Sequence, residues 1–219
     1  MIRVFKRCAA IFLAGSLCLT AGCELAGVAM DRASGGPTVK AKYIPAPHDP
    51  MLVLVESYGL ALDSGIEEEH MTLSLSQTLT NNNIAMVLSG TRLERLKDSD
   101  PREYHKMTIA DIGRKVGAKQ ILYVNISRAE ITKPPGSGQM RGHMEATVKI
   151  VDSVTAETRW PTDSASETVQ ITTNWIPDNA NKSDSDMRAK MADQMAEDIG
   201  KLFHDYYPDQ EPMPKVNVD

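Results

Sequence analysis

The side chain with the clearest chemical potential in this sequence is the thiol of Cys23. It is the last of 3 cysteines among 219 residues, and the small residues Thr20, Ala21 and Gly22 directly precede it. A cysteine can serve as a core residue, half of a disulfide, a metal ligand or a reactive thiol. Small residues upstream let a peptidase reach the backbone, and the thiol can then accept a lipid group. The pattern therefore predicts an attachment reaction at Cys23.

The segment before Cys23 has the layout of an export signal. A basic head is followed by the uncharged apolar stretch 8–19, which is too short to span a bilayer permanently. The string "LTAGCE" at residues 19–24 resembles the bacterial lipobox, although Thr20 stands where Leu is usual. The resemblance implies that residues 1–22 are a lipoprotein signal peptide and that Cys23 becomes a lipidated first residue. The alternative is a plain secretory signal followed by an unmodified cysteine.

The lipid on Cys23 would make a membrane the first partner of the protein. Acyl chains such as palmitate contribute about 0.8 kcal/mol per buried methylene, so several of them hold a protein firmly without a spanning helix. We expect a location in the cell envelope, facing the periplasm. Glu24 follows Cys23, where an Asp is an inner-membrane retention signal in some bacteria, so the outer membrane is preferred over the inner one.

The remaining reactive side chains form no recognisable catalytic or metal motif. The 5 histidines are scattered, without an HExxH pattern or a pair spaced by four. The acidic triplet 67–69 before His70 is better explained as the first turn of a helix, where acids oppose the helix dipole. Trp160 and Trp175 either cap a sheet edge or stack on a ligand. We therefore predict no catalytic residue, no metal and no cofactor.

Composition restricts the class of partner and the number of domains. The net charge is −5 with scattered basic residues, which argues against binding to the phosphate backbone of a nucleic acid. Aromatic residues make up 5% of the chain, so aliphatic and methionine side chains must fill the core. The patterned part of the chain suits one domain.

The periodicity predicts a single α/β domain over residues 51–207. Residues 23–50 read as a lipidated flexible tether, and residues 208–219 as a disordered tail. The predicted order is β-α-β-α-β-β-β-α, a mixed sheet with helices packed on it, after the lipoprotein signal peptide. Strands are expected at residues 51–57, 84–90, 120–132, 141–153 and 158–174, and helices at 64–80, 108–117 and 183–207. In the charged segment 91–106 we also expect a helical turn around Leu93 and Leu96, followed by a loop at Pro101.

Local signals fix several details of these elements. Ser64 and Thr108 are the expected N-caps, Gly117 is an expected helix stop, and Asp152 is expected to form an Asx turn with the residues up to Thr155. The first helix has two adjoining stripes at helical spacing, one with Ile66, His70 and Leu73 and one with Met71, Leu75 and Leu79, and we expect it to lie with both on the strand 51–57. The last helix has one stripe, which we expect to be buried against the sheet: Met187, Met191, Met195, Ile199, Leu202, Phe203 and Tyr206.

Three passages give a resemblance to a known superfamily. Residues 51–57 before a helix, the passage "IADIGRKVGAKQILYVNI" at 109–126, and "VDSVTAETRWP" at 151–161 are similar to the periplasmic superfamily of the TolB amino-terminal domain, CsgG and the LpoB lipoproteins. We expect neither the propeller that follows the domain in TolB nor the long amphipathic hairpins of a CsgG-like pore. The resemblance implies a partner-binding lipoprotein of the envelope.

These observations lead to one expected function and its alternatives. We expect a non-enzymatic, membrane-anchored lipoprotein that docks a periplasmic complex of cell-wall synthesis or of secretion and assembly, with an envelope protein as partner. The alternatives are a periplasmic carrier of a small ligand and a hydrolase with an unrecognised site. The first candidate for the interaction surface is the polar loop between two long strands, formed by Lys133, Pro134, Pro135, Gly136, Ser137, Gly138 and Gln139.

Overall fold

The computed structural model describes residues 38–57, 66–179 and 183–208. The chain divides into two compact units, of which the larger runs from Ala41 to His204. In the smaller unit, the backbone N–H of Val39 donates to the carbonyl of Tyr206 at 2.9 Å, and Lys40 pairs with Asp205 at 2.6 Å. The expected signal peptide, Cys23, the predicted cap Ser64 and most of the expected tether and tail lie outside the described residues.

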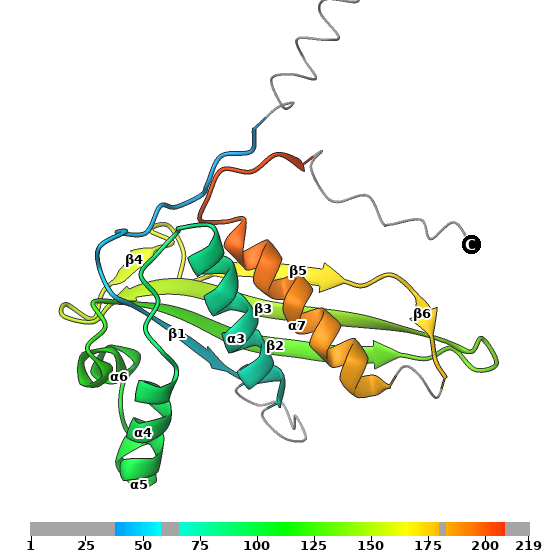
Figure 1. The fold of residues 1–219 in the computed structure, drawn as a ribbon, viewed down its shortest axis with the longest axis horizontal. Coiled ribbons are helices and arrows are strands. Elements are labelled where there is room, and N and C mark those ends of the chain that lie inside the picture. Colours follow the sequence, from blue (N-terminus) through cyan, green and yellow to red (C-terminus); the bar gives the residue numbers. More distant parts are fainter. Residues whose placement is uncertain (1–37, 58–65, 180–182, 209–219) are drawn as a thin grey trace, which may run out of the picture. The chain divides into compact units, whose positions relative to one another are not determined.

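The larger unit is built on a mixed sheet with helices packed against it (Figure 1). In chain order, the elements are β1 (Met51–Glu56), α3 (Ile66–Asn81), α4 (Thr91–Ser99), α5 (Pro101–Tyr104), α6 (Ile109–Val116), β2 (Gln120–Thr132), β3 (Gln139–Asp152), β4 (Thr158–Trp160), β5 (Glu167–Thr172), β6 (Ile176–Pro177) and α7 (Asp184–Gly200). β1 is parallel to β2, and β2 is antiparallel to β3. The other side of β3 is paired in turn with β4, β5 and β6. The predicted α/β class, with a mixed sheet of six strands and helices on it, is confirmed.

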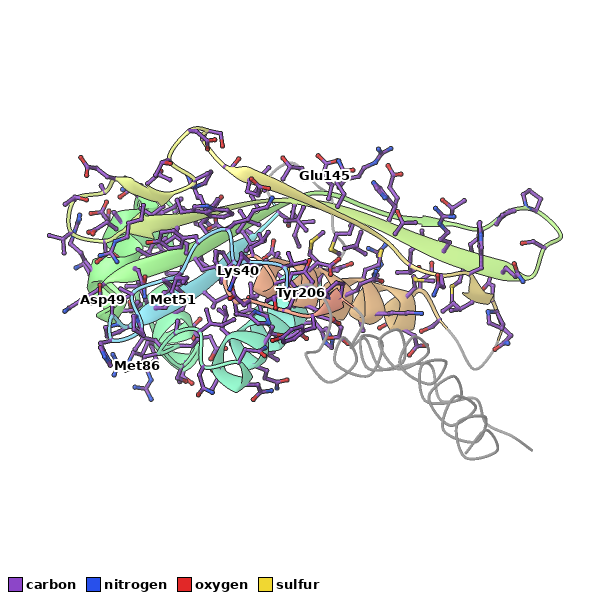
Figure 2. The ribbon with its side chains drawn as sticks, turned by 90° about the horizontal axis from the view of Figure 1, so that it is seen from above. Lys40, Asp49, Met51, Met86, Glu145 and Tyr206 are labelled. Atoms are coloured by element: carbon purple, nitrogen blue, oxygen red, sulfur yellow. The ribbon has the colours of Figure 1, made fainter. Side chains whose placement is uncertain are left out.

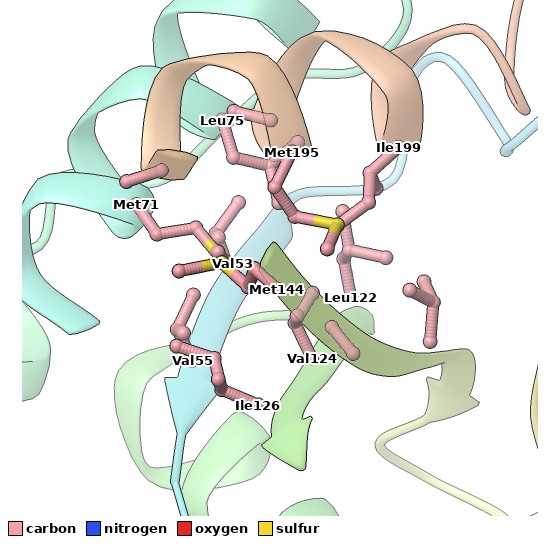
Figure 3. Packing of buried hydrophobic residues seen from close by; sticks show 14 of the residues in the cluster. Val53, Val55, Met71, Leu75, Leu122, Val124, Ile126, Met144, Met195 and Ile199 are labelled. Atoms are coloured by element: carbon pink, nitrogen blue, oxygen red, sulfur yellow. The ribbon is translucent and has the colours of Figure 1, made fainter. Parts of the chain in front are cut away.

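The main core lies between the sheet and the helices α3 and α7, which run side by side (Figure 1). Figure 3 shows how Val53 and Val55 of β1 meet Met71 and Leu75 of α3. Gly200 of α7 marks a close approach of the two helices, because a Cβ there would lie 2.5 Å from Cγ2 of Thr78. Small residues at such a crossing let two helices pack closely.

A second core lies on the opposite face of the sheet. Because successive side chains of a strand point to opposite faces, Leu52 and Leu54 leave the main core and pack with α4, α5 and α6. Ile112 and Val116 of α6 are buried there, as the sequence pattern predicted. α6 begins with a capping box at Thr108 and ends at Gly117 in a left-handed conformation, with φ of 82°. Both predicted helix boundaries are therefore confirmed.

The structure decides between the two possible stripes of α3. Met71, Leu75 and Leu79 are fully buried, whereas the side chain of Leu73 is 56% exposed. The expectation that the stripe with Leu73 also faces the sheet is therefore wrong. His70 lies instead at the solvent-facing boundary with α7, where its Nε2 is 3.1 Å from Asp193 Oδ1.

α7 carries the predicted methionine stripe but is shorter than predicted. Met187, Met191 and Met195 are fully buried beneath the sheet. The helix ends at Gly200, and the next residues continue as turns. Phe203 remains buried after the helix end, but Leu202 is only half-buried.

The secondary structure differs from the prediction in three further segments. Residues 84–90 do not form a strand, because only Val87 bridges to Met51 before α4 begins. The expected strand 158–174 is divided into β4 and β5 by an excursion that begins at the cis peptide bond Trp160–Pro161. Residues 91–106, where we expected at most one helical turn, contain the helices α4 and α5.

Residues 41–50, which we expect to be part of the tether, lie in the larger unit. The backbone N–H of Lys42 donates to the Leu202 carbonyl at 2.8 Å. The ring of Tyr43 lies 6.2 Å from that of Trp160. These contacts join the beginning of the unit to the turns after α7 and to β4.

Candidate functional site

One face of β2, β3 and β5 is polar and lies away from α3 and α7. Figure 2 places Glu145 on the side of the sheet opposite α7. Its neighbours across the strands are Arg128 on β2 and Gln170 on β5. Within the described ranges, the helices α4, α5 and α6 pack near one end of this face, against β1 and the start of β2. Among the described residues, no helix packs on the rest of this face.

The side chains on this polar face are paired with one another. Gln170 donates through Nε2 to Glu145 Oε2 at 2.9 Å, and Arg128 donates through Nε to Glu130 at 2.8 Å. Farther along β3, the ammonium of Lys149 lies 5.2 Å from the ring centre of Tyr123. The face thus carries both signs of charge in alternation, which suits a polar protein partner better than a membrane or a polyanion.

The predicted interaction loop is the exposed tip of the β2–β3 hairpin. Residues 135–139 are exposed, and Ser137 stabilises the turn by donating through Oγ to the Pro134 carbonyl at 2.8 Å. The base of the loop is held in place. Lys133 pairs with Asp178 at 3.2 Å and with Asp184 at 2.6 Å, and the Asp178 N–H donates to the Gly138 carbonyl at 2.8 Å.

The pairing of Lys133 raises its pKa, chiefly through hydrogen bonds to Asp184 and Asp178. Gln139 belongs to β3 and pairs with Pro177 of β6. The hairpin tip is therefore held in place at its base, and its residues 135–139 are exposed. The role of this loop in binding stays a prediction.

A shallow pocket lies beside this hairpin on the polar face. It has a volume of about 190 Å³ and is lined by Arg141, His143, Thr172 and Trp175, among others. The Trp175 side chain is 43% exposed, and the Arg141 guanidinium stands 5.4 Å from its ring centre. Because the cation already covers the ring, a structural role of this tryptophan is favoured over stacking on a ligand.

A second pocket, of about 230 Å³, lies at the carboxyl end of β1. Its polar side chains include Glu56, Glu68, Lys97 and His105. Ser57 donates through Oγ to Glu68 and so orients that carboxylate. Sequence reasoning missed this pocket, since its residues come from β1, α3, α4 and the end of α5. Carboxylates with an ammonium and an imidazole can bind a small polar molecule of mixed charge.

The other ionisable residues serve the fold. Arg159 of β4 donates to Asp152 at 2.7 Å and to Asp49 at 3.2 Å, which ties the start of the unit to the sheet. The N–H groups of Thr155 and Val154 donate to Asp152 Oδ1 at 3.0 and 2.7 Å, so the predicted Asx turn is confirmed. These groups, first the Thr155 N–H and then Arg159, lower the pKa of Asp152.

Within the described part of the chain, no group of three or more His, Cys, Asp or Glu side chains is placed to hold a metal ion. Nor is any helix among residues 38–57, 66–179 and 183–208 long and apolar enough to cross a membrane.

No family model matches the sequence, and no curated protein matches it either. Among solved structures, the chain is similar to Lipoprotein GNA1162 from Neisseria meningitidis, with 16% identity and a TM-score of 0.44, over 70% of this chain and 99% of that one. It is also similar to a PelC dodecamer from Paraburkholderia phytofirmans, with 11% identity and a TM-score of 0.42, over 77% of this chain and 96% of that one.

A third similar structure is a DUF330 protein from Xanthomonas campestris, with 14% identity and a TM-score of 0.37, over 75% of this chain and 88% of that one. None of these three is a TolB, CsgG or LpoB protein, so that finer resemblance stays a prediction. At these identities the likeness concerns the arrangement of the chain and assigns no partner or activity.

Proposed function

We propose that the protein is a lipid-anchored, non-enzymatic component of the bacterial cell envelope that docks a periplasmic complex through the polar face of its sheet and the tip of the β2–β3 hairpin. The observation that carries the proposal is the small-residue run ending in Cys23 after an export-type segment. It is followed by a compact α/β unit that leaves much of one sheet face open among the described residues. The lipid would hold the unit at the membrane, with the outer membrane preferred.

The anchor is tested by replacing the attachment residue. Cys23→Ser should abolish lipidation and processing before residue 23, and the protein should leave the membrane fraction, because no acyl chains remain to hold it. Intact mass and fractionation on a sucrose gradient measure both effects and identify the membrane. A variant that is still cleaved after Gly22 and still sediments with membranes would refute the lipid anchor.

The docking surface is tested by comparing two variants, one in the β2–β3 turn and one in the β3–β4 turn, at opposite ends of β3. In the first variant, residues 134–139 are replaced by Asn-Gly, a two-residue turn that brings Lys133 opposite Met140 and keeps the register of Thr132 with Arg141. The matched control is Val154→Ser in the β3–β4 turn, where the native side chain is 73% exposed. Cross-linking in intact envelopes should lose partner adducts with the first variant only. Unchanged adducts in a folded loop variant would exclude the hairpin tip as the contact.

A second candidate function is the binding of a small polar ligand in the pocket at the end of β1. It is favoured by the two carboxylates and the imidazole that line this pocket. Glu68→Gln should then remove a small molecule that native mass spectrometry detects on protein purified from envelopes. If the native protein carries no such molecule, and none from a panel of amino acids and polyamines raises its melting temperature, this candidate is ruled out.

A further inference from the structure

β5 is an edge strand, and along its whole length it is paired on one side with β3. The backbone N–H of Thr173, just after β5, donates to the Gly142 carbonyl at 3.0 Å. In the continuing register Ile171 is opposite Met144, and Val169 is opposite Ala146. Because backbone groups of a strand alternate in direction, the odd-numbered residues bond to β3. Thr168, Gln170 and Thr172 therefore direct their N–H and carbonyl groups away from the sheet.

The direction of these groups agrees with the rest of β3. The N–H of Asp152 donates to the Glu157 carbonyl, toward β4, and Ser127 of β2 donates to the Glu145 carbonyl. Even-numbered residues of β3 thus face the β4 and β5 side, and odd-numbered residues face β2. No backbone hydrogen bond joins the outward groups of β5 to any other backbone group in the described ranges.

The edge is accessible and lacks the usual protection against pairing. Thr168, Gln170 and Thr172 are all exposed. Natural sheets guard such edges with lysine, proline, an inward charge or a bulge. β5 has the sequence ETVQIT, in which the only charge is Glu167 at its start, and its pairing with β3 has no bulge. The carboxylate of Glu167 is bound by Lys42 of the same chain.

We propose that the free edge of β5 pairs antiparallel with the same edge of a second copy of this chain, about a two-fold axis at Gln170. In this register Gln170 faces Gln170 of the partner subunit, and Thr168 faces Thr172 of the partner subunit. All the outward backbone groups of the three residues then find partners. With an axis at Val169, Thr172 would face residue 166 of the partner subunit, which lies outside β5. With an axis at Ile171, Thr168 would face residue 174 of the partner subunit, which also lies outside β5.

The side chains of β5 are complementary to themselves in this register. Thr168 and Thr172 form a β-branched cross-strand pair, which stabilises a sheet. On the core side, Val169 comes opposite Ile171 of the partner subunit, so apolar residues meet apolar residues. No like charges come opposite each other, since Glu167 faces Thr173 of the partner subunit. β5 of a second copy is therefore complementary to this edge. The pairing does not depend on the lipid anchor or on the docking role of the hairpin tip.

The register is tested by cysteine cross-linking of the full-length chain in membrane vesicles. Opposed residues of a hydrogen-bonded pair have Cα atoms about 5.5 Å apart, a distance at which a disulfide can form. Gln170→Cys should therefore give a covalent dimer under mild oxidation. Thr172→Cys is the matched control, because two such residues are about 13 Å apart in this register, at about 3.3 Å per residue. A mixture of Thr168→Cys chains and Thr172→Cys chains should cross-link again.

Circular dichroism and melting curves verify that each variant is folded, and the native chain reveals any dimer formed through its own cysteines. The proposal is overturned if folded Gln170→Cys stays monomeric while its thiol reacts with a maleimide. It is equally overturned if Thr172→Cys alone dimerises as well as Gln170→Cys, or if Gln170→Cys is trapped on a different protein. Gln170→Pro provides an independent measurement, because it removes an outward N–H without breaking a bond to β3. It should lower the dimer fraction seen with an amine cross-linker at least several-fold.

Discussion

Replacing Gly142 by alanine should destabilise the domain, because β3 and α7 touch at this glycine. A Cβ at residue 142 would lie 2.4 Å from the sulfur and 2.6 Å from Cγ of Met191, and 3.1 Å from the sulfur of Met187. Both methionines are fully buried, so they have little free volume to move into. Overpacking of this kind costs about 1–3 kcal/mol. The lower entropy of the unfolded alanine chain offsets about 0.4–1 kcal/mol. We expect a net loss of about 1–2 kcal/mol.

A double-mutant cycle with Met191→Ala tests the physical cause. Met191→Ala alone should cost about 2–5 kcal/mol through lost burial and the cavity left behind. In the double variant, the methyl group added by Gly142→Ala occupies part of that cavity and no longer meets the methionine side chain. The summed cost of the two single changes should therefore exceed that of the double change by about 1 kcal/mol or more.

Urea denaturation followed by circular dichroism measures the free energy of unfolding for each member of the cycle. Gly90→Ala is the matched control, since a Cβ there would meet no atom within 4 Å and φ is −55°. It should change the stability by less than about 0.5 kcal/mol. If the costs of Gly142→Ala and Met191→Ala simply add, α7 does not rest on Gly142 as described.

Asp152→Asn should cost about 1–3 kcal/mol at pH 7, because the carboxylate accepts charge-assisted and backbone hydrogen bonds from Arg159 and Thr155. The pKa of Asp152 is lowered in the folded protein. Its stabilisation is therefore present above the unfolded pKa of about 3.9 and is lost as the pH falls through the lower folded pKa. If urea titrations gave the same difference in free energy of unfolding between Asp152→Asn and the native protein at pH 2.5 as at pH 7, this reasoning would be contradicted. Leu202→Ala should cost about 1–2 kcal/mol, less than the about 2–5 kcal/mol of Met195→Ala, because only Met195 is fully buried. Equal shifts of the two melting temperatures would show that Leu202 is packed as deeply as Met195.

Elements whose signals are local could be predicted from the amino-acid sequence alone. A capping residue, an apolar stripe and a glycine stop lie within a few residues of one another, so the span of α6 from Thr108 to Gly117 followed from the chain alone. The buried stripe of α7 could be predicted in the same way, because its apolar residues recur on one side of the helix only. The strands β2 and β3 were found from their length and alternation. The class of the fold follows from the order of these elements.

Tertiary structure decided every feature that depends on residues far apart in the sequence. Both stripes of α3 have helical spacing, and only the packing of α7 and the sheet beside that helix selects the one with Leu75 over the one with Leu73. The ion pair of Asp49 with Arg159 joins residues that no local pattern connects, and it places the start of the unit on the sheet. The edge of β5 likewise depends on distant residues, because β3 pairs with one side of that strand and no strand of the described ranges pairs with the other. Local propensity is a property of a few neighbouring residues, whereas burial, edges and pockets arise from which surfaces the folded chain brings together.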